Sequence, residues 1–328
     1  MENVNISDDE MKKSNSIISA ISNYYTSKIV GQKNLQKSLL ISLISNGHLL
    51  VESVPGLAKT TAAKVLTESC GGKFSRIQCT PDLLPSDIMG TQTYNAKTAE
   101  FDTKIGPVYA NFVLLDEINR SSSKTQSAML EAMQERQVSI GGVRYALPEI
   151  FIVIATQNPI EQEGTYLLSE AQQDRFILKE VLEYPSSDEE MEILNRIENN
   201  VFEQSKKVVE LQHIKYLQEL SKKVYIDQSI KQYIIRIVEA TRRPFKVIRP
   251  ELARYITVGA STRASIAFME AGKALALING RSYVTPDDIK ELSHSVLRHR
   301  IALSFEAMAY EIEVEAIIDA IIGSIKAP

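Results

Sequence analysis

The hydrophobic pattern changes once along the chain, near residue 185. Between Gly31 and Tyr184, short and continuous apolar runs alternate with helical patterns. The apolar runs are HLLVES, FSRIQC, NFVLLDE and IFIVIATQN, and each is bounded by polar or turn residues. Continuous apolar strands that alternate with helices predict a parallel sheet covered on both faces. TTAAKVLTESC reads as a helix that ends at Gly71-Gly72.

After Pro185 the pattern from residue 188 to residue 327 is almost wholly helical, as in IKQYIIRIVEATR and GASTRASIAFMEAGKALALI. In VTPDDIKELSHSVL, Thr285 suits an N-cap, Pro286 the first helical position, and Asp287 and Asp288 the positive helix end. The segment VEAIIDAIIGSI carries one apolar face, which we interpret as core packing in preference to a partner surface. Its members are Val314, Ile317, Ile318, Ile321, Ile322 and Ile325.

The pattern up to about Lys28 predicts a polar lead with one amphipathic helix around Ile17 to Tyr25. We therefore predict an N-terminal helical lead over 1–28, an α/β core over 29–185 and a helical domain over 186–328. Neither an internal repeat nor a low-complexity tract interrupts this order.

Composition narrows the class of protein. The 328 residues are 44% hydrophobic and 24% charged, which is typical of a globular protein. The net charge of −4 argues against broad, non-specific nucleic-acid binding. Cys70 and Cys79 form no disulfide framework, and the four histidines are scattered. No apolar run reaches the roughly 20 residues that span a bilayer, and the polar N-terminus is unlike a signal peptide, so we expect a cytoplasmic protein.

The stretch VESVPGLAKTTAAKVL has the form of a phosphate-binding loop that leads into a helix. Lys59 and Thr60 match the motif G-x-x-x-x-G-K-[ST], whereas Ser53 and Ala58 occupy its two glycine positions. In such a loop, backbone N–H groups and the helix N-terminus attract phosphate oxygens. Lys59 would contact the β- and γ-phosphates, and the Thr60 hydroxyl would bind Mg²⁺. Taken alone, this altered loop leaves a working site and an accidental match equally open.

An acidic pair ends the run NFVLLDE, in the form of a Walker B strand. Burying such a pair is costly unless it serves a cation or a proton transfer. Asp116 would hold hydrated Mg²⁺, and Glu117 would orient and deprotonate the attacking water. A strand that merely meets a polar turn is the alternative.

Two further polar residues follow in order. Asn158 ends FIVIATQN, where its amide would bond to the attacking water or the γ-phosphate. Arg175 in LSEAQQDRF is a candidate arginine finger that acts across a subunit boundary. Alone, the Asn-Pro pair would mark a turn and the Asp-Arg pair would be a surface feature.

The order Lys-Thr, Asp-Glu, Asn, Arg is that of an AAA+ ATPase, and the chain resembles MoxR-type AAA+ ATPases over nearly its whole length. The segments that carry the resemblance are IVGQ, VESVPGLAKT, PDLLPSDIMG, GPVYANFVLLDEINR, QSAMLEAMQERQVSIGG, ATQNPIEQEGTY, EAQQDRF, GASTRA and VTPDDIKELSHSVLRHR. The resemblance implies an AAA+ P-loop NTPase core with a parallel sheet between helices, followed by an all-helical lid domain.

The resemblance also implies roles for single residues. Arg263 of GASTRA looks like the sensor 2 arginine that reaches the γ-phosphate, although it also belongs to a basic run. Arg120 is a candidate contact to a neighbouring subunit. Residues of IVGQ would flank adenine, and loop residues would cradle the phosphates of ATP or ADP. These nucleotide-binding residues are Val30, Gly31, Gln32, Pro55, Gly56, Leu57, Ala58, Lys59, Thr60 and Thr61.

Two segments fit the hairpin insertions of this branch of AAA+ proteins. GTQTYNAKTAEFDTKIG precedes the Walker B strand, and VSIGGVRYAL has Gly141-Gly142 at a two-residue turn. The resemblance implies that they face the ring pore or a partner; ordinary surface hairpins are the alternative. It further implies hexameric rings and partners that carry von Willebrand A domains.

The chain departs from the family pattern at the two loop glycines and at three prolines. Leu167, Ser169 and Thr262 replace those prolines, which affects turn stiffness. Because a non-glycine residue with positive φ is strained, we predict negative φ at both Ser53 and Ala58.

Three hypotheses about function follow. The first is Mg²⁺-dependent ATP hydrolysis that drives the remodelling or maturation of protein partners. The second is a nucleotide-binding switch with negligible hydrolysis, which the altered loop motivates. The third, a nucleic-acid motor or a chelatase-type subunit, is disfavoured by the acidic charge and by the segments outside the nucleotide site.

Overall fold

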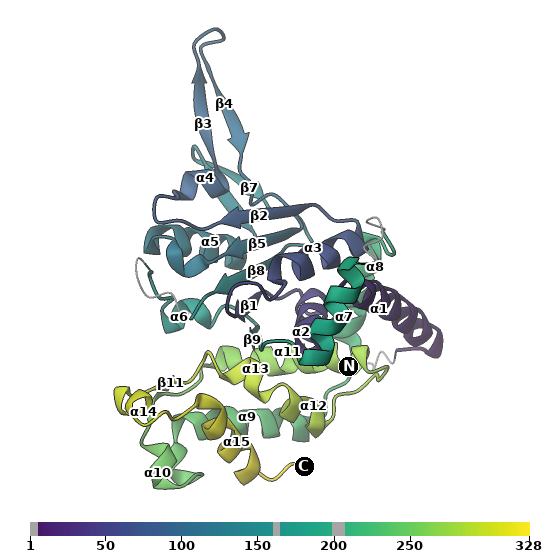
Figure 1. Cartoon of the computed structure of the whole chain (residues 1–328), viewed down its shortest axis with the longest axis vertical. Helices are drawn as coiled ribbons and strands as arrows, with labels where there is room; N and C mark the ends of the chain where they lie inside the picture. The colour runs from purple at the N-terminus through teal and green to yellow at the C-terminus, as the bar shows by residue number, and fades with distance from the viewer. Residues whose placement is uncertain (1–5, 160–164, 199–206) are drawn as a thin grey trace. The chain divides into compact units, whose positions relative to one another are not determined.

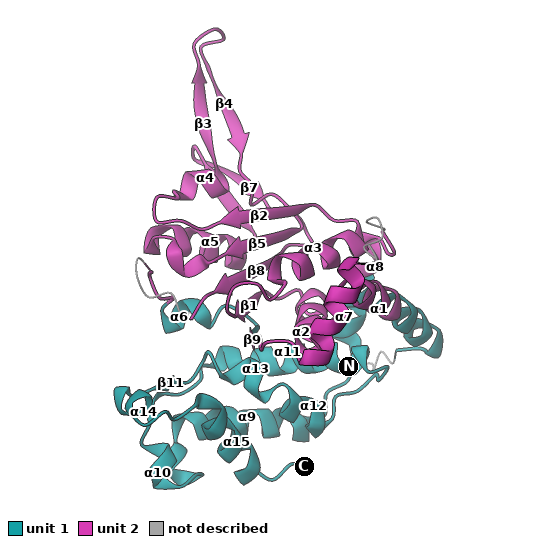
Figure 2. Ribbon diagram, viewed as in Figure 1, with its two compact units in different colours: residues 1–18, 169–179, 216–328 teal, residues 19–168, 180–215 magenta. Residues whose placement is uncertain are grey.

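The computed structural model describes residues 6–159, 165–198 and 207–328. It divides into two compact units (Figure 2). One unit, the sheet unit, comprises residues 19–168 and 180–215. The other, the helical unit, comprises residues 1–18, 169–179 and 216–328. The three consecutive domains expected from the sequence, 1–28, 29–185 and 186–328, remain a prediction.

The sheet unit is built on the strand order β2-β5-β8-β1-β9 (Figure 1). β5 pairs in parallel with β2 and β8, and β8 pairs in parallel with β1, as the apolar runs predict. β9 straddles the boundary between the two units. The strands are β1 (Leu49–Glu52), β2 (Phe74–Gln78), β5 (Phe112–Asp116), β8 (Ile152–Gln157) and β9 (Leu178–Val181).

Every residue of β5 and β8 is buried, so both faces of the central strands are covered. This burial explains why these strands read as continuous apolar runs. α3 ends where the sequence predicts, because Gly71 takes the left-handed conformation (φ 65°) at its C-cap. The helices of the sheet unit are α2 (Lys33–Ile44), α3 (Lys59–Cys70), α4 (Pro85–Met89), η1 (Ile118–Arg120), α5 (Ser123–Glu135) and α7 (Ser187–Glu198).

Both predicted hairpins are present. β3 (Gly90–Asn95) and β4 (Glu100–Ile105) pair antiparallel and project from the sheet unit (Figure 1). β6 (Gln137–Ile140) and β7 (Val143–Ala146) are joined by Gly141 and Gly142, both with positive φ, as a two-residue turn requires.

The N-terminal helix is longer than predicted: α1 spans Asp8–Lys28 and runs from the helical unit into the sheet unit. Its start lies upstream because Ser7 and Glu10 cap one another. The Ser7 N–H donates to the Glu10 carboxylate, and the Glu10 N–H donates to the Ser7 hydroxyl. The amphipathic pattern around Ile17 to Tyr25 marks only the apolar part of this helix.

Helices dominate the described residues after 185, as predicted, and a short antiparallel pair of strands joins them, β10 (Ile256–Val258) and β11 (Ala302–Leu303). α8 crosses between the units at residue 216. The helices that lie wholly or partly in the helical unit, besides α1, are α6 (Glu170–Gln173), α8 (Leu211–Lys223), α9 (Gln228–Arg242), η2 (Pro244–Lys246), α10 (Pro250–Ala253), α11 (Thr262–Ile278), α12 (Pro286–Glu291), α13 (Ser293–Leu297), α14 (Phe305–Ala309) and α15 (Val314–Ser324).

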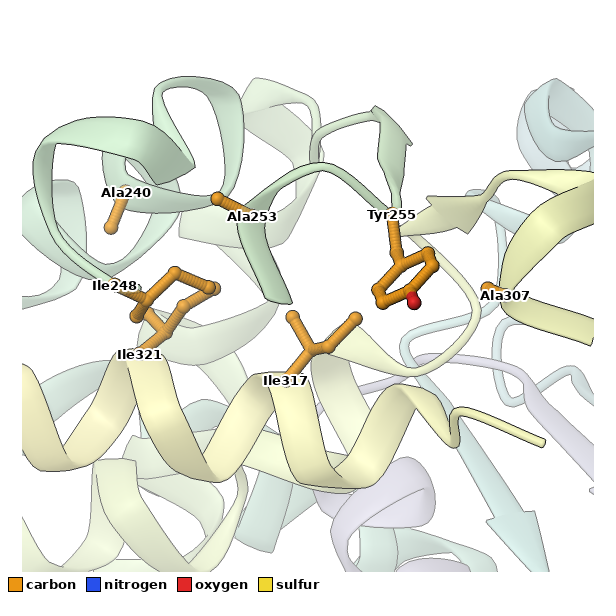
Figure 3. Packing of buried hydrophobic residues seen from close by; sticks show 7 residues of the cluster. All are labelled: Ala240, Ile248, Ala253, Tyr255, Ala307, Ile317 and Ile321. Carbon is orange, nitrogen blue, oxygen red and sulfur yellow. The ribbon is translucent and has the colours of Figure 1, made fainter. Parts of the chain in front are cut away.

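The apolar face of α15 packs into a core, as interpreted from its spacing. Ile317 and Ile321 are fully buried against Ile248 and Tyr255 (Figure 3). The cap of α12 is also as predicted, because the Thr285 hydroxyl accepts the Asp288 N–H. Within the described ranges, the chain has no helix whose length and apolar character would let it cross a bilayer.

Candidate nucleotide site

Three neighbouring strands end at one edge of the sheet and present the predicted polar residues there. The parallel pairing places Glu52 of β1 opposite Gln157 of β8. It places Leu115 of β5 opposite Ala155 of β8. The loop after β1, the acidic pair after β5 and Asn158 after β8 therefore share the carboxyl edge of the sheet. Ligands of open α/β sheets bind at this edge.

The loop after β1 is anchored at Ser53 and enters α3 at Lys59. Ser53 is buried, and its N–H donates to the carbonyl of Gln157 at 3.1 Å. This bond continues the β1–β8 pairing into the loop, and φ at Ser53 is not positive, as predicted. Gly56 has φ 90°, a conformation that glycine alone adopts without strain.

The prediction for Ala58 is wrong: its φ is 56°, in the left-handed region. Ala58 is the N-cap of α3, and its carbonyl accepts the Ala62 N–H at 2.8 Å. The chain must turn sharply here to start the helix directly behind the loop. The turn sets the backbone conformation, and alanine adopts it at a cost of about 1–2 kcal/mol. This geometry explains why the motif has glycine at position 58.

Lys59, Thr60 and Thr61 form the first turn of α3, directly after the loop. The Lys59 ammonium donates to the carbonyl of Ser53 at 3.3 Å, so it lies across the loop. The residues Val30, Gly31 and Gln32 lie at the turn between α1 and α2, with left-handed φ at Gly31 and Gln32. Gln32 donates from Nε2 to the Glu183 carbonyl at 3.1 Å.

Asp116 is buried at the end of β5 and is held from two sides. Its Oδ1 accepts the Thr156 hydroxyl at 2.9 Å. Its Oδ2 accepts Nε and Nη2 of Arg76 on the adjacent strand β2, at 3.1 and 2.6 Å. The arginine supplies the opposite charge that a buried carboxylate needs.

Glu117 adopts φ 57° as the N-cap of η1, so a non-glycine residue is held in the left-handed conformation at this site. Its N–H donates to the Thr156 hydroxyl at 2.9 Å, and its carboxylate accepts from Gln78 and Arg120 at 3.1 and 3.2 Å. Strained backbone of this kind is concentrated at functional sites, where the surrounding structure over-determines it. The backbone and its three partners fix where the carboxylate points.

Asn158 is buried directly after β8. Asn119 donates from Nδ2 to the Asn158 carbonyl at 3.5 Å, which joins the turn after β5 to the end of β8. Residues 160–164, part of the motif ATQNPIEQEGTY, lie outside the described residues.

Arg175 and Arg263 both lie in the helical unit. Asp174 directly precedes Arg175 and lies 3.7 Å from Nη1 of Arg263. It also accepts the Ser261 hydroxyl at 2.7 Å and Nε of Arg300 at 2.8 Å. Arg300 is almost fully buried, which lowers its pKa to about 10. This buried ion pair ties the segment that carries Arg175 to the turn after α13.

Sequence reasoning missed four residues of this network. Arg76 and Thr156 are polar residues within the strands FSRIQC and IVIATQ, and this local feature could have marked them as part of the site. Asp174 and Arg300 gave no local signal, because they are 126 positions apart.

The loop, the acidic pair and the parallel sheet define a P-loop nucleotide-binding protein with a helical lid. A family model described as ATPase family associated with various cellular activities (AAA) matches residues 48–178, and an AAA lid domain model matches residues 251–321. The chain is 46% identical to Chaperone MoxR1 of Mycobacterium tuberculosis over 300 residues, which cover 92% of this chain and 79% of that one.

Two further relatives agree. The protein YeaC of Bacillus subtilis is 45% identical, over 92% of this chain and 91% of its own. A crystal structure from Cytophaga hutchinsonii, provisionally assigned as an ATPase, superposes with a TM-score of 0.89 at 44% identity, over 98% of this chain and 97% of that one. The chain belongs to the MoxR family of AAA+ ATPases.

Proposed function

We propose that this chain hydrolyses ATP with Mg²⁺ and uses the reaction to remodel or mature protein partners. The observation that carries the proposal is the pair at the end of β5. Asp116 is buried with its carboxylate braced by Thr156, and Glu117 is held in a strained conformation by three partners. Burying one carboxylate and straining the backbone of the next residue lowers the stability of the fold. A catalytic role for the pair explains why the chain keeps this arrangement.

The proposed roles follow the chemistry of each side chain. Lys59 binds the β- and γ-phosphates, while Val30 to Gln32 flank adenine and Pro55 to Thr61 cradle the phosphates. Glu117 orients the attacking water and takes its proton. Asn158 positions the water or the γ-phosphate.

Two arginines of the helical unit have proposed roles in hydrolysis. Arg263 contacts the γ-phosphate as sensor 2. Arg175 stabilises the transition state from a neighbouring subunit, which requires a ring, for which we propose a hexamer. Asp174 contacts Arg263 and directly precedes Arg175, and its ion pair with Arg300 holds this part of the chain in place.

The donor set at the end of β5 fits Mg²⁺. Asp116 and Thr60 offer a carboxylate and a hydroxyl, the hard oxygen ligands that Mg²⁺ prefers, and phosphates and water complete its shell. When bound, the ion neutralises charge that develops on the phosphates. Arg76 now contacts the Asp116 oxygen Oδ2, so this arginine must share or release that oxygen.

A nucleotide-binding switch with negligible hydrolysis is the second candidate. Ser53 and Ala58, which replace the two glycines of the loop motif, motivate it, and the left-handed φ of Ala58 adds weight to it because alanine is strained there. All the residues to which we assign catalytic roles, from Lys59 to Arg263 along the chain, are present, and this favours hydrolysis. The proposed partners, proteins with von Willebrand A domains, suit either candidate.

Turnover of Mg-ATP, measured against protein concentration, separates the candidates. We expect turnover that rises with concentration, because Arg175 acts on a neighbour. Glu117→Gln should lower turnover by about 10²-fold or more and retain ATP binding. Arg175→Ala should lower it by about 10³-fold and abolish its dependence on concentration. Binding without turnover at any concentration would support the switch, and stimulation by DNA would support a nucleic-acid motor.

A further inference from the structure

A basic pocket lies in the helical unit on residues that the nucleotide site does not use. It has a volume of about 490 Å³, within the usual range for ligand pockets. α9, the turn after it and the end of α15 line the pocket. The lining residues are Arg236, Glu239, Ala240, Arg243, Lys246, Val247, Ser324, Ile325 and Lys326.

The pocket follows from the helical spacing of α9. Arg236, Ala240 and Arg243 stand four and three positions apart, so they share one face of the helix. η2 begins at Pro244 and turns the chain back, which brings Lys246 and Val247 to the same side.

The floor of the pocket is apolar and firmly supported. Ala240 belongs to the buried cluster around Ile248 and Ile321, and Figure 3 shows these three side chains together. Val247 and Ile325 are half-buried and pack against the same cluster. A ligand would therefore meet a fixed apolar surface that needs no rearrangement to form.

The charge around this floor is strongly positive. Four of the lining side chains are basic and one, Glu239, is acidic. Glu239 already pairs with Arg243 at 3.2 Å. Across the described part of the chain, no carboxylate lies within ion-pair distance of Arg236, Lys246 or Lys326; Arg236 lies 5.9 Å from the centroid of the Tyr233 ring.

The favourable interaction of cations with the C-terminal end of α9 explains only some of these basic residues. Arg242 and Arg243 stand at the C-terminal end of α9, where cations interact favourably with the helix dipole. Arg236 lies two turns earlier, where that interaction has decayed. Like charges that converge without partners cost free energy in the absence of an anion.

We propose that this pocket binds an acidic segment of a protein partner, with an apolar side chain on the floor and carboxylates against the basic rim. Clusters of arginine and lysine recognise acidic motifs in this way. A nucleic acid fits less well, because the lining contains no aromatic side chain on which a base could stack. The pocket shares no residue with the proposed nucleotide site, so the proposal does not depend on ATP hydrolysis.

Fluorescence anisotropy with a short labelled peptide, in which glutamates flank a leucine, tests the proposal on the full chain. We expect saturable binding that weakens with salt. The double variant Arg236→Glu/Lys246→Glu should weaken binding by about tenfold or more. Lys231→Glu is the matched control, because Lys231 lies on α9 outside the pocket and its reversal should leave affinity unchanged.

Two altered peptides and a second variant sharpen the test. Replacing the glutamates by glutamine or the leucine by serine should each weaken binding several-fold. If the double variant fails to fold, the single variant Lys326→Glu replaces it, and we expect it to show part of the loss of peptide affinity. The double variant should retain the basal ATPase rate of the wild type.

Peptide affinity that is the same in the wild type and in the double variant would overturn the proposal. So would equal binding of the glutamine peptide. A labelled DNA duplex that binds more tightly than the peptide, and loses affinity on Arg236→Glu/Lys246→Glu, would assign the pocket to nucleic acid and overturn it as well.

Discussion

The guanidinium of Arg300 lies against the carboxylate of Asp174, with Nε 2.8 Å from Oδ1, and only 2% of the arginine side chain is exposed. The same guanidinium donates to the carbonyls of Phe176 and Ile177. A short segment that carries Arg175 is thereby tied to helices more than a hundred residues later in the chain. The role of the ion pair is structural, because it holds the segment that carries Arg175, a residue to which we assign catalysis.

Breaking this pair should be costly. Arg300→Met leaves the Asp174 charge without its main partner, so we expect the free energy of unfolding to fall by about 3–5 kcal/mol. Arg263→Gln is the control: its contact to Asp174 is 3.7 Å long and half-exposed, and we expect a loss below about 1 kcal/mol. Urea denaturation followed by circular dichroism measures both. Equal losses for the two variants would contradict the role of Arg300.

Ala58→Gly should stabilise the protein. Glycine removes the left-handed strain at φ 56° but loses more chain entropy on folding, so we expect a net gain of about 0.5–1 kcal/mol. Ala128→Gly within α5 is the control with the opposite sign and should cost about 1 kcal/mol. Denaturant midpoints measure both variants. A loss of stability in Ala58→Gly would mean that alanine fits the loop without strain.

Arg76→Ala should lower the Mg²⁺ concentration needed for tight nucleotide binding by several-fold. Removing the guanidinium frees Oδ2 of Asp116 for the cation, because the two compete for the same oxygen. Titration of Mg²⁺ against a fluorescent ATP analogue measures the midpoint. Lys73→Ala removes a charge from the region just before β2 and should leave the midpoint unchanged. A higher midpoint in Arg76→Ala would show that Arg76 helps to bind phosphate.

Stability should fall as the pH drops below about 6.5, through the buried His48. Its Nδ1 accepts the Val153 N–H at 3.0 Å, and Nε2 lies 3.3 Å from the Met133 carbonyl, so the ring is neutral. Burial and the nearby Arg136 lower the pKa of His48 from 6.5 to about 3. Between these two pH values, His48 therefore takes up a proton when the protein unfolds. The contribution of neutral His48 to the free energy of unfolding is fully present above pH 6.5. Below pH 6.5 the free energy of unfolding decreases by about 1.4 kcal/mol per pH unit.

Urea unfolding at several pH values between 5 and 7 checks this expectation. His48→Asn keeps an acceptor for the Val153 N–H and should reduce the pH slope by about one proton. Burial lowers the pKa of His299 as well, so part of the slope should remain in the variant. An unchanged slope in His48→Asn would show that His48 does not titrate on unfolding.

Local signals predicted much of the fold. Continuous apolar runs placed β1, β5 and β8 because buried parallel strands need apolar side chains on both faces. Gly71 and Thr285 placed helix ends because caps satisfy backbone groups within a few residues. The start of α1 was misplaced because the cap at Ser7 and Glu10 lies in a polar stretch without apolar periodicity.

The sequence by itself determined the family, the strand–loop–helix around Lys59 and the acidic pair at the end of β5, because these depend on residues that are neighbours in the chain. Only the tertiary structure decided how the site residues are held. Arg76 and Thr156 reach Asp116 from adjacent strands, and Arg300 reaches Asp174 across 126 positions. The conformation of Ala58 was likewise set by the turn between β1 and α3 and not by the preference of alanine. Such relationships depend on strand register and on which elements pack together, and no local pattern encodes them.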